Sequence, residues 1–225
     1  MKTTCDNITA LKNKYVPVAV GNGDITFLVD NQGAMFPNDD YKSALNTKRK
    51  VNPEIFRAGV RYDARGHELV SFGRFEQEIT GAGELEKWSQ SLDVFNAITT
   101  THCEYSNGVI VDSEIFCHLE HNVIAIRKCV TANPTPDFTF KYILGKPRRM
   151  TTRYDEDRIF YNVDEGQYEG VIALWSDKLE QAGNGILHGN AKAFCVFIAF
   201  DEADIEWFKN KRFDELFVKV RGGRK

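Results

Sequence analysis

Two short clusters of histidine and cysteine are the first residues in this sequence whose types suggest chemistry. His102 and Cys103 form one pair, Cys117 and His118 form a second, and His121 follows close behind. Imidazole nitrogen and thiolate sulfur are preferred ligands of Zn²⁺ in proteins, so together the clusters have the composition of a zinc site. Whether they can meet depends on the strands that carry them.

A β-hairpin is predicted between the two clusters, over residues 98–118. Two β-rich stretches flank Asn107-Gly108, the dipeptide best suited to a two-residue type I′ turn. With these residues as the loop, Cys103 lies opposite Asp112, and Cys117 is about 17 Å further along the ladder. This separation is too large for a disulfide or a shared metal ion. We therefore predict core cysteines, histidines on a partly exposed strand face, and no metal or other cofactor.

The stretch from Pro53 to Trp88 has a composition typical of sugar-binding sites. It combines arginine, carboxylate and imidazole groups with aromatic rings, and such groups bind sugar hydroxyls and the faces of sugar rings. The same residue types also form ordinary surface ion pairs, so a purely structural role is the alternative for each of them. The candidate substrate contacts are Arg61, Asp63, His67, Arg74 and Trp88.

The local motifs of common enzyme classes are absent from the sequence. It has no Gly-x-Ser-x-Gly nucleophile elbow, no His-Glu-x-x-His motif and no Walker loop, and we assign no catalytic residue. The stretch 20–24, Val-Gly-Asn-Gly-Asp, has neither the complete dinucleotide fingerprint nor a following βαβ unit, so it predicts a tight turn between strands. His102 with Glu104, and His118 with Glu120, are acid and base pairs that a sugar epimerase would need.

The elements that must position these residues are predominantly strands. Short β-rich runs separated by turn residues extend from about Val16 to Phe200, and 16 phenylalanines and 8 tyrosines suit pleated, half-buried surfaces. If so many strands formed one open sheet, one apolar face of that sheet would be exposed to water. The number of strands therefore favours a large two-sheet antiparallel sandwich or a closed barrel. The strands predicted after the hairpin are 123–130, 138–144, 158–163, 168–175 and 193–200.

The pattern becomes helical only after Phe200. Asp201 can cap a helix over residues 202–211, with acidic side chains at its start and basic side chains at its end. An apolar stripe with helical spacing follows, formed by Phe213, Leu216, Phe217 and Val220. This stripe either packs back on the sandwich or belongs against another domain. We therefore divide the chain into a β-sandwich domain, residues 1–200, and a helical segment, residues 201–225.

Composition restricts the partners and the compartment. The 225 residues include 29 Lys and Arg against 32 Asp and Glu, so a net charge of -3 gives no basic field for nucleic acid. The sequence has no 18-residue apolar stretch and no secretory signal, so we expect no membrane span. Five cysteines, an odd number, suit reduced thiols. The expected location is the cytoplasm, or the periplasm or exterior if a signal peptide has been removed.

The order of five segments resembles the N-terminal β-sandwich of glycoside hydrolases and phosphorylases whose catalytic domain is a six-hairpin helical barrel. This family includes maltose and trehalose phosphorylases and bacterial α-L-fucosidases. The segments are Val18-Ala19-Val20-Gly21-Asn22-Gly23, Pro53–Gly59, Phe72-Gly73-Arg74-Phe75, Trp88–Asp93 and Asn122–Arg127. The resemblance covers about residues 16–200.

The resemblance implies two stacked antiparallel sheets, similar to the galactose mutarotase-like supersandwich. In this family the catalytic carboxylates belong to the helical barrel, which follows the sandwich through a helical linker. The chain is then a non-catalytic N-terminal domain of a carbohydrate-active enzyme. Its partners would be a carbohydrate and the C-terminal helical-barrel domain of the same polypeptide, whose sugar site it would help to shape through residues 57–74.

Two other functions stay open from the sequence. The first is a stand-alone carbohydrate-binding module that stacks Trp88 on a sugar, since Trp175 and Trp207 are expected in a core strand and a helix. The second is a mutarotase-like sugar epimerase that uses one of the two histidine and carboxylate pairs. The identity of the sugar, and the choice between hydrolysis and phosphorolysis, would be decided in the barrel.

Overall fold

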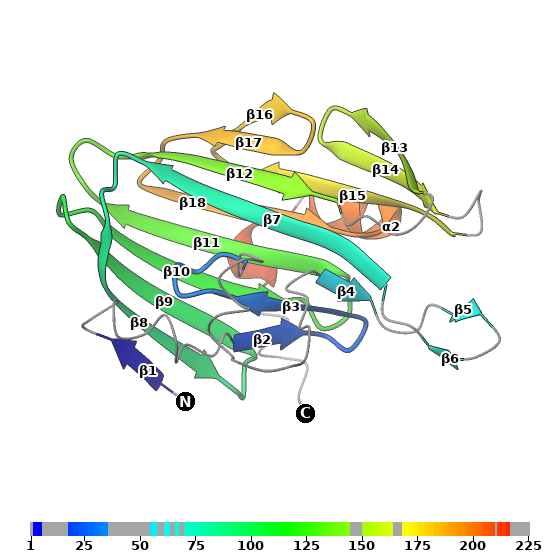
Figure 1. Ribbon diagram of the computed structural model, residues 1–225, viewed down its shortest axis with the longest axis horizontal. Coiled ribbons are helices and arrows are strands. Elements are labelled where there is room, and N and C mark those ends of the chain that lie inside the picture. Colours follow the sequence, from blue (N-terminus) through cyan, green and yellow to red (C-terminus); the bar gives the residue numbers. More distant parts are fainter. Residues whose placement is uncertain are drawn as a thin grey trace.

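Two antiparallel sheets packed face to face make up the body of the molecule (Figure 1). The structure is a computed structural model, and it describes residues 2–5, 18–35, 55–57, 61–63, 66–67, 70–144, 150–163, 168–209 and 211–216. The predicted all-β sandwich with short C-terminal helical elements is confirmed. Each of the five strands predicted after the hairpin is present within about one residue of its predicted bounds.

The larger sheet has nine strands, and neighbours in space are all antiparallel. Its spatial order is β1 (Lys2–Cys5), β8 (Leu85–Asp93), β9 (Ile98–Tyr105), β10 (Ile110–Cys117), β11 (Val123–Thr131), β18 (Ala193–Ala199), β15 (Tyr168–Ser176), β14 (Arg158–Val163) and β13 (Met150–Asp155).

The smaller sheet has seven strands and covers one face of the larger one. Its spatial order is β16 (Glu180–Gly183), β17 (Ile186–Gly189), β12 (Asp137–Ile143), β7 (Val70–Thr80), β4 (Ile55–Arg57), β3 (Ile25–Val29) and β2 (Val18–Gly21). A separate two-stranded ribbon, β5 (Arg61–Asp63) with β6 (Gly66–His67), extends beyond the end of the sheets (Figure 1).

The hairpin between β9 and β10 is confirmed, but the predicted register is wrong by one residue. Val111, not Asp112, lies opposite Cys103. The turn is closed by a hydrogen bond from the Tyr105 N–H to the Val109 carbonyl, so it contains three residues rather than two. Only Gly108 in this turn has a positive φ, whereas a type I′ turn needs two such residues in succession. The two cysteines of the zinc hypothesis stay far apart, and both are free thiols.

The main hydrophobic core lies between the inner faces of the two sheets. The smaller sheet contributes large aromatic side chains, Phe27, Phe75, Phe138 and Phe140 among them. The larger sheet contributes mainly branched aliphatic side chains such as Ile115 and Ile126. Alternation along each strand turns every second side chain into this core, which is the pattern expected of a sandwich.

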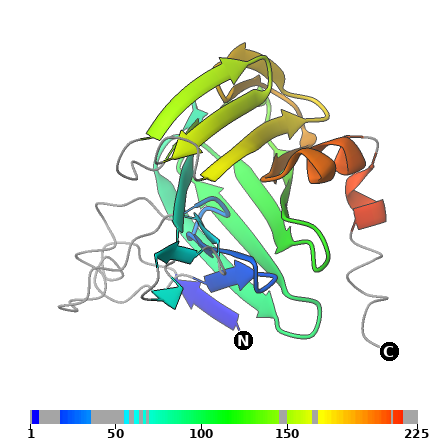
Figure 2. The same ribbon diagram turned by 90° about the vertical axis from the view of Figure 1, so that its right-hand side faces the viewer.

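A second hydrophobic cluster covers part of the outer face of the larger sheet. There Phe116 and Phe197 pack against Phe208 of α2 (Glu202–Phe208) and against Phe213 and Leu216 of the helical turn at 213–216. Figure 2 shows α2 on the side of the larger sheet that faces away from the smaller one. The described part of the predicted apolar stripe therefore packs back on the sandwich. Phe217 and Val220 lie outside the described residues.

The helix after Phe200 is shorter than predicted, and it is held differently at its start. It ends at Phe208 rather than at residue 211. Asp201 occupies the N-cap position, but its side chain makes no capping hydrogen bond and instead accepts one from Asn122 Nδ2 at 2.9 Å. Ion pairs of 2.6 Å join Arg158 of β14 to Glu202 and Glu206. The position of α2 is therefore set by the sheet.

The Gly-Asn-Gly motif forms the predicted tight turn between β2 and β3. The Oδ1 atom of Asn22 accepts hydrogen bonds from the backbone N–H groups of Asp24 and Ile25 at 2.9 Å each. Its Nδ2 atom donates to the carbonyls of His118 and His121 in the turn between β10 and β11. A single asparagine thus closes its own turn and joins it to the larger sheet.

A row of four polar side chains crosses the otherwise apolar inner face of the larger sheet. Gln90, Thr101, Ser113 and Lys128 are direct neighbours on β8, β9, β10 and β11, and all four are buried. We call them the polar row. The polar row binds the segment 30–35, which follows β3. Gln90 Nε2, for example, donates a hydrogen bond to the Asp30 carbonyl at 2.7 Å.

Lys128 is the charged member of the polar row and is fully buried. Its Nζ atom donates to the carbonyls of Gln32 and Gly33 at 2.9 and 2.8 Å and to Ser113 Oγ at 2.9 Å. Burial lowers the pKa of Lys128 to about 8, although the nearby Asp30 carboxylate opposes this shift. Gly33 has a φ of +66°, and a Cβ at this position would lie 2.6 Å from Ser113 Cβ. The contact therefore requires both the lysine and the glycine.

Lys128→Met is expected to lower the free energy of unfolding by about 2–4 kcal/mol, because two carbonyls and one hydroxyl lose their buried donor. Urea denaturation followed by circular dichroism measures this change. Lys141→Met is the matched control, since Lys141 lies on an exposed position of β12, and it should change stability by less than about 0.5 kcal/mol. Equal stability of the two variants would contradict the structural role of Lys128.

The depressed pKa of Lys128 also predicts how stability depends on pH. Between about pH 8 and its ordinary pKa of 10.5, the unfolded chain holds a proton that the folded chain has released. The contribution of Lys128 to the free energy of unfolding therefore rises with pH in this window, by on the order of 3 kcal/mol in total. Urea denaturation at several pH values should show wild type gaining stability relative to Lys128→Met. A constant difference between the two proteins would contradict the shift.

Candidate functional site

Three of the five predicted sugar contacts lie on the ribbon formed by β5 and β6. Arg61 is paired with His67, and Asp63 is paired with Gly66. The structure therefore brings the backbones of Arg61, Asp63 and His67 together. For these three residues it describes the backbone only. The ribbon stands apart from the strands of the larger sheet (Figure 1).

The other two predicted contacts lie on different faces of the sandwich. Arg74 is on the outer face of the smaller sheet, where it forms an ion pair of 2.8 Å with Glu76. Trp88 is on the inner face of the larger sheet opposite Cys103, and only 2% of it is exposed. A ring this deeply buried offers no face to a sugar, so the predicted role of Trp88 is wrong. Its position between the two sheets makes it part of the core.

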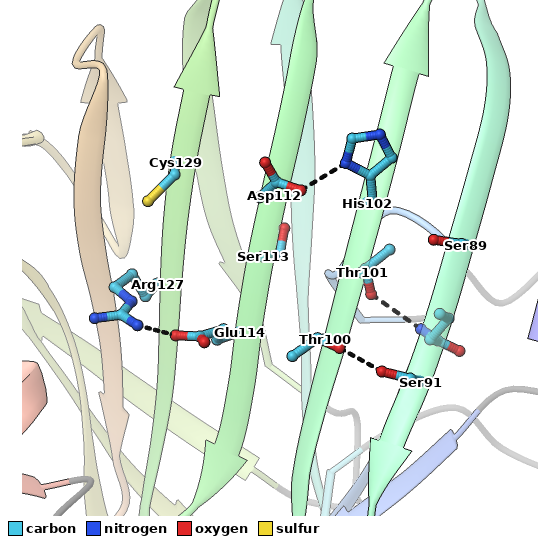
Figure 3. Close-up of a pocket in the computed structure, with 11 residues that line it drawn as sticks. Ser89, Ser91, Thr100, Thr101, His102, Asp112, Ser113, Glu114, Arg127 and Cys129 are labelled. Atoms are coloured by element: carbon cyan, nitrogen blue, oxygen red, sulfur yellow. Dashed lines mark hydrogen bonds and ion pairs between the residues drawn. The ribbon is translucent and has the colours of Figure 1, made fainter. Parts of the chain in front are cut away.

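A polar groove of about 470 Å³ lies on the outer face of the larger sheet (Figure 3). It crosses four consecutive strands, β8 to β11, beside the region that the C-terminal segment covers. We call it the outer-face groove. Eight of the residues at the groove have outward side chains: Ser89, Ser91, Thr100, His102, Asp112, Glu114, Arg127 and Cys129. The other three, Gln90, Thr101 and Ser113, belong to the polar row, whose side chains face inward.

Strand register explains why these side chains gather. Two rows of cross-strand neighbours face outward, one on each side of the polar row. Because side chains alternate between faces, the inward direction of the polar row forces both flanking rows outward. The first row is Ser89, His102, Asp112 and Cys129, and the second is Ser91, Thr100, Glu114 and Arg127.

Arg127 connects the outer-face groove to the C-terminal segment. It forms ion pairs with Glu114 and, at 3.0 Å, with Asp214, and its guanidinium lies 4.7 Å from the centre of the Phe213 ring. Burial alone would lower the pKa of Arg127, but the two carboxylates outweigh it and raise the pKa further. The guanidinium therefore stays charged and has a fixed orientation at one end of the groove.

His102 lies between two carboxylates at the other end of the groove. Its Nδ1 atom is 2.6 Å from Asp112 Oδ1, and its Nε2 atom is 3.6 Å from Glu104 Oε1. A hydrogen bond from Lys87, at 2.9 Å, lowers the pKa of Glu104, and His102 adds to this effect. An imidazole held between carboxylates can carry a proton to or from a ligand in the groove.

The buried cysteines, and the pair formed by His118 and Glu120, are poorly placed to react with a ligand. Burial raises the pKa of Cys103 and of Cys195 to about 12, so neither thiol is a nucleophile at neutral pH. Cys129 is exposed at the groove. His118 is 1% exposed, so the predicted acid and base pair of His118 with Glu120 is wrong. In the described part of the chain, no group of three or more His, Cys, Asp or Glu side chains is arranged to hold a metal ion.

The sequence predicts that His102 and Glu104 share a strand face, but it does not predict that the other groove residues gather beside them. The available signal was alternation: Ser89 and Ser91 repeat on one strand, and Asp112 and Glu114 repeat on another. Finding the groove required the register of three successive hairpin pairings, and the predicted register of the central one was displaced by one residue.

Comparison with known proteins adds no assignment to this geometry. No protein-family model matches the sequence, and a search of curated proteins found no match to it. Among the described residues, no helix is long and apolar enough to cross a membrane.

Proposed function

We propose that this chain is a non-catalytic sandwich domain of a carbohydrate-active enzyme, a glycoside hydrolase or a phosphorylase. In this proposal it packs on a helical-barrel catalytic domain and helps to hold the sugar. The observation that carries the proposal is the outer-face groove, which lies on a large antiparallel sandwich beside a helical C-terminal segment. The resemblance of five sequence segments to the N-terminal domains of such enzymes is consistent with it.

The chemistry of the outer-face groove suits sugar hydroxyls. Ser89, Ser91 and Thr100 present hydroxyl groups that can both donate and accept hydrogen bonds. Asp112 and Glu114 supply carboxylate acceptors, and the hydroxyls of Ser91 and Thr100 are already within 2.5 Å of each other. A sugar presents donors and acceptors around its whole ring, so closely spaced groups of both kinds are what its recognition requires.

An exposed apolar pair near the outer-face groove suits the packing of a second domain. Val94 and Phe95, in the turn between β8 and β9, are 66% and 82% exposed. The Asp93 carboxylate accepts hydrogen bonds from the backbone N–H groups of Phe95 and Asn96, which holds this turn in one shape. In the proposed arrangement the second domain would cover these two side chains.

Saturable sugar binding at the outer-face groove is the expected result of an NMR titration of the isotopically labelled chain with maltose and trehalose. Amide shifts should map to β8–β11. Arg127→Gln should weaken binding about tenfold, because it removes the charged donor and leaves Glu114 without its counter-ion. Lys141→Gln, on the outer face of the smaller sheet, is the matched control and should bind as wild type does.

Three outcomes separate the alternatives. Shifts confined to the β5–β6 ribbon, or no shifts at high sugar concentration, would contradict the groove. A change in tryptophan emission on binding would favour a stand-alone binding module. The module has less support, because Trp88 is buried and Trp175 and Trp207 pack against the second hydrophobic cluster.

The arrangement of His102 between Asp112 and Glu104 supports a second candidate, a sugar epimerase. Such an enzyme needs an acid and a base within reach of one sugar. Polarimetry of freshly dissolved α-D-glucose distinguishes the candidates. The non-catalytic proposal expects mutarotation at the rate of buffer alone, whereas an acceleration that His102→Asn abolishes would establish the epimerase.

A further inference from the structure

Strand β13 forms one edge of the larger sheet as the described strands define it. Within the described residues it pairs only with β14. The side chains from Thr151 to Glu156 are all exposed. In Figure 2 the strand lies at the outer rim of the sheet, with no described element beside its free side. Among the described strands only β14 uses the backbone groups of β13, and those on its other side are the groups that a further strand would pair with.

The strand has neither the proline nor the register shift that often interrupts an edge strand. Its register with β14 is continuous over six residue pairs, and Thr151–Glu156 contains no proline or glycine. The edge strand β16 of the smaller sheet differs, because its register with β17 shifts between Gln181 and Gly183. A shifted, glycine-containing edge is a poor template for pairing, whereas a regular one is a good template.

The sequence of β13 is complementary to itself in the antiparallel direction. Arg153 and Asp155 flank Tyr154. When two copies pair with Tyr154 opposite Tyr154, each Arg153 lies opposite the Asp155 of the other copy. A shift of one copy by two residues relative to the other places Arg153 opposite Arg153, which like-charge repulsion disfavours. Charge therefore selects both the partner and the register.

The two charged side chains are exposed and already positioned. The guanidinium of Arg153 lies 4.1 Å from the centre of the Phe160 ring and 3.3 Å from the Asp155 carboxylate. Their side chains are 64% and 57% exposed, so both can accept a second partner. Phe160 is paired with Val171, a residue of the second hydrophobic cluster, so the charges lie on the outer face of the sheet. Tyr154, which is 42% exposed, lies on the opposite face.

We propose that β13 is a homodimer interface, in which two copies of this chain pair edge to edge about a two-fold axis at Tyr154. The two nine-stranded sheets then form one continuous sheet. Each interface contains two reciprocal Arg153–Asp155 pairs, as an isologous contact requires. The proposal rests on β13 alone and is independent of the proposed carbohydrate function.

Sedimentation velocity over a concentration series tests the proposal by charge exchange. Wild type should show a concentration-dependent equilibrium between monomer and dimer. Arg153→Asp alone, or Asp155→Arg alone, replaces two attractive pairs per dimer with two repulsive ones and should raise the dissociation constant about tenfold or more. The double variant R153D/D155R restores opposite charges in both pairs and should return the dissociation constant to within about threefold of wild type.

Two controls make the result decisive. Glu180→Arg reverses a charge on the exposed edge strand β16 and should leave dimerisation unchanged. Thermal unfolding by circular dichroism should show that every variant is folded. A wild-type protein that is monomeric at every concentration would overturn the proposal. So would a dimer that neither single reversal weakens, or a double variant no stronger than the single ones.

Discussion

The burial of Lys128 constrains the rest of this structure more than any other interaction. Its ammonium group lies in the core, where Gln32, Gly33 and Ser113 accept hydrogen bonds from it. The nearby Asp30 carboxylate also favours its charged form. Two of these acceptors belong to the segment after β3 and one belongs to β10. The lysine therefore joins the two sheets with directional bonds, as the hydrogen bonds from Gln90 to Asp30 and from Asn22 to the turn after β10 also do. The rest of the interface is mainly non-directional hydrophobic packing.

This constraint reaches the opposite face of the larger sheet. A slip of one residue on any strand from β8 to β11 would bury a side chain of the outer-face groove and expose a member of the polar row. The cost of leaving Lys128 or its acceptors without partners opposes such a slip. Ser91, His102 and Arg127 are held outward for this reason, although none of them contacts the segment 30–35. The polar row on the inner face of the sheet thus fixes the positions of the groove residues on the outer face.

The positions of the strands could be predicted from the local sequence, whereas the register between strands and the face on which a side chain lies could not. Strand positions follow from β-rich runs between turn residues, and those predictions were accurate to about one residue. The register error arose because Asn107 suits a type I′ turn, yet the turn includes Ser106 and keeps only Gly108 at positive φ. Trp88 illustrates the same limit. Its residue type suits a sugar contact, and only the pairing of β8 with β9 shows that it faces the core.

The balance of charge in the outer-face groove narrows its chemistry. Of the residues that line the groove, Asp112 and Glu114 carry carboxylates and Arg127 carries a guanidinium. Beyond the lining, Glu104 is already matched by Lys87. Negative groups therefore exceed positive ones, so the groove disfavours phosphorylated or acidic ligands and favours neutral ones with many hydroxyls. Contacts of this kind are individually weak in an open groove, because water competes for every hydrogen bond. They gain importance when a second surface closes over the ligand, which is the arrangement expected of a sandwich domain packed on a catalytic one.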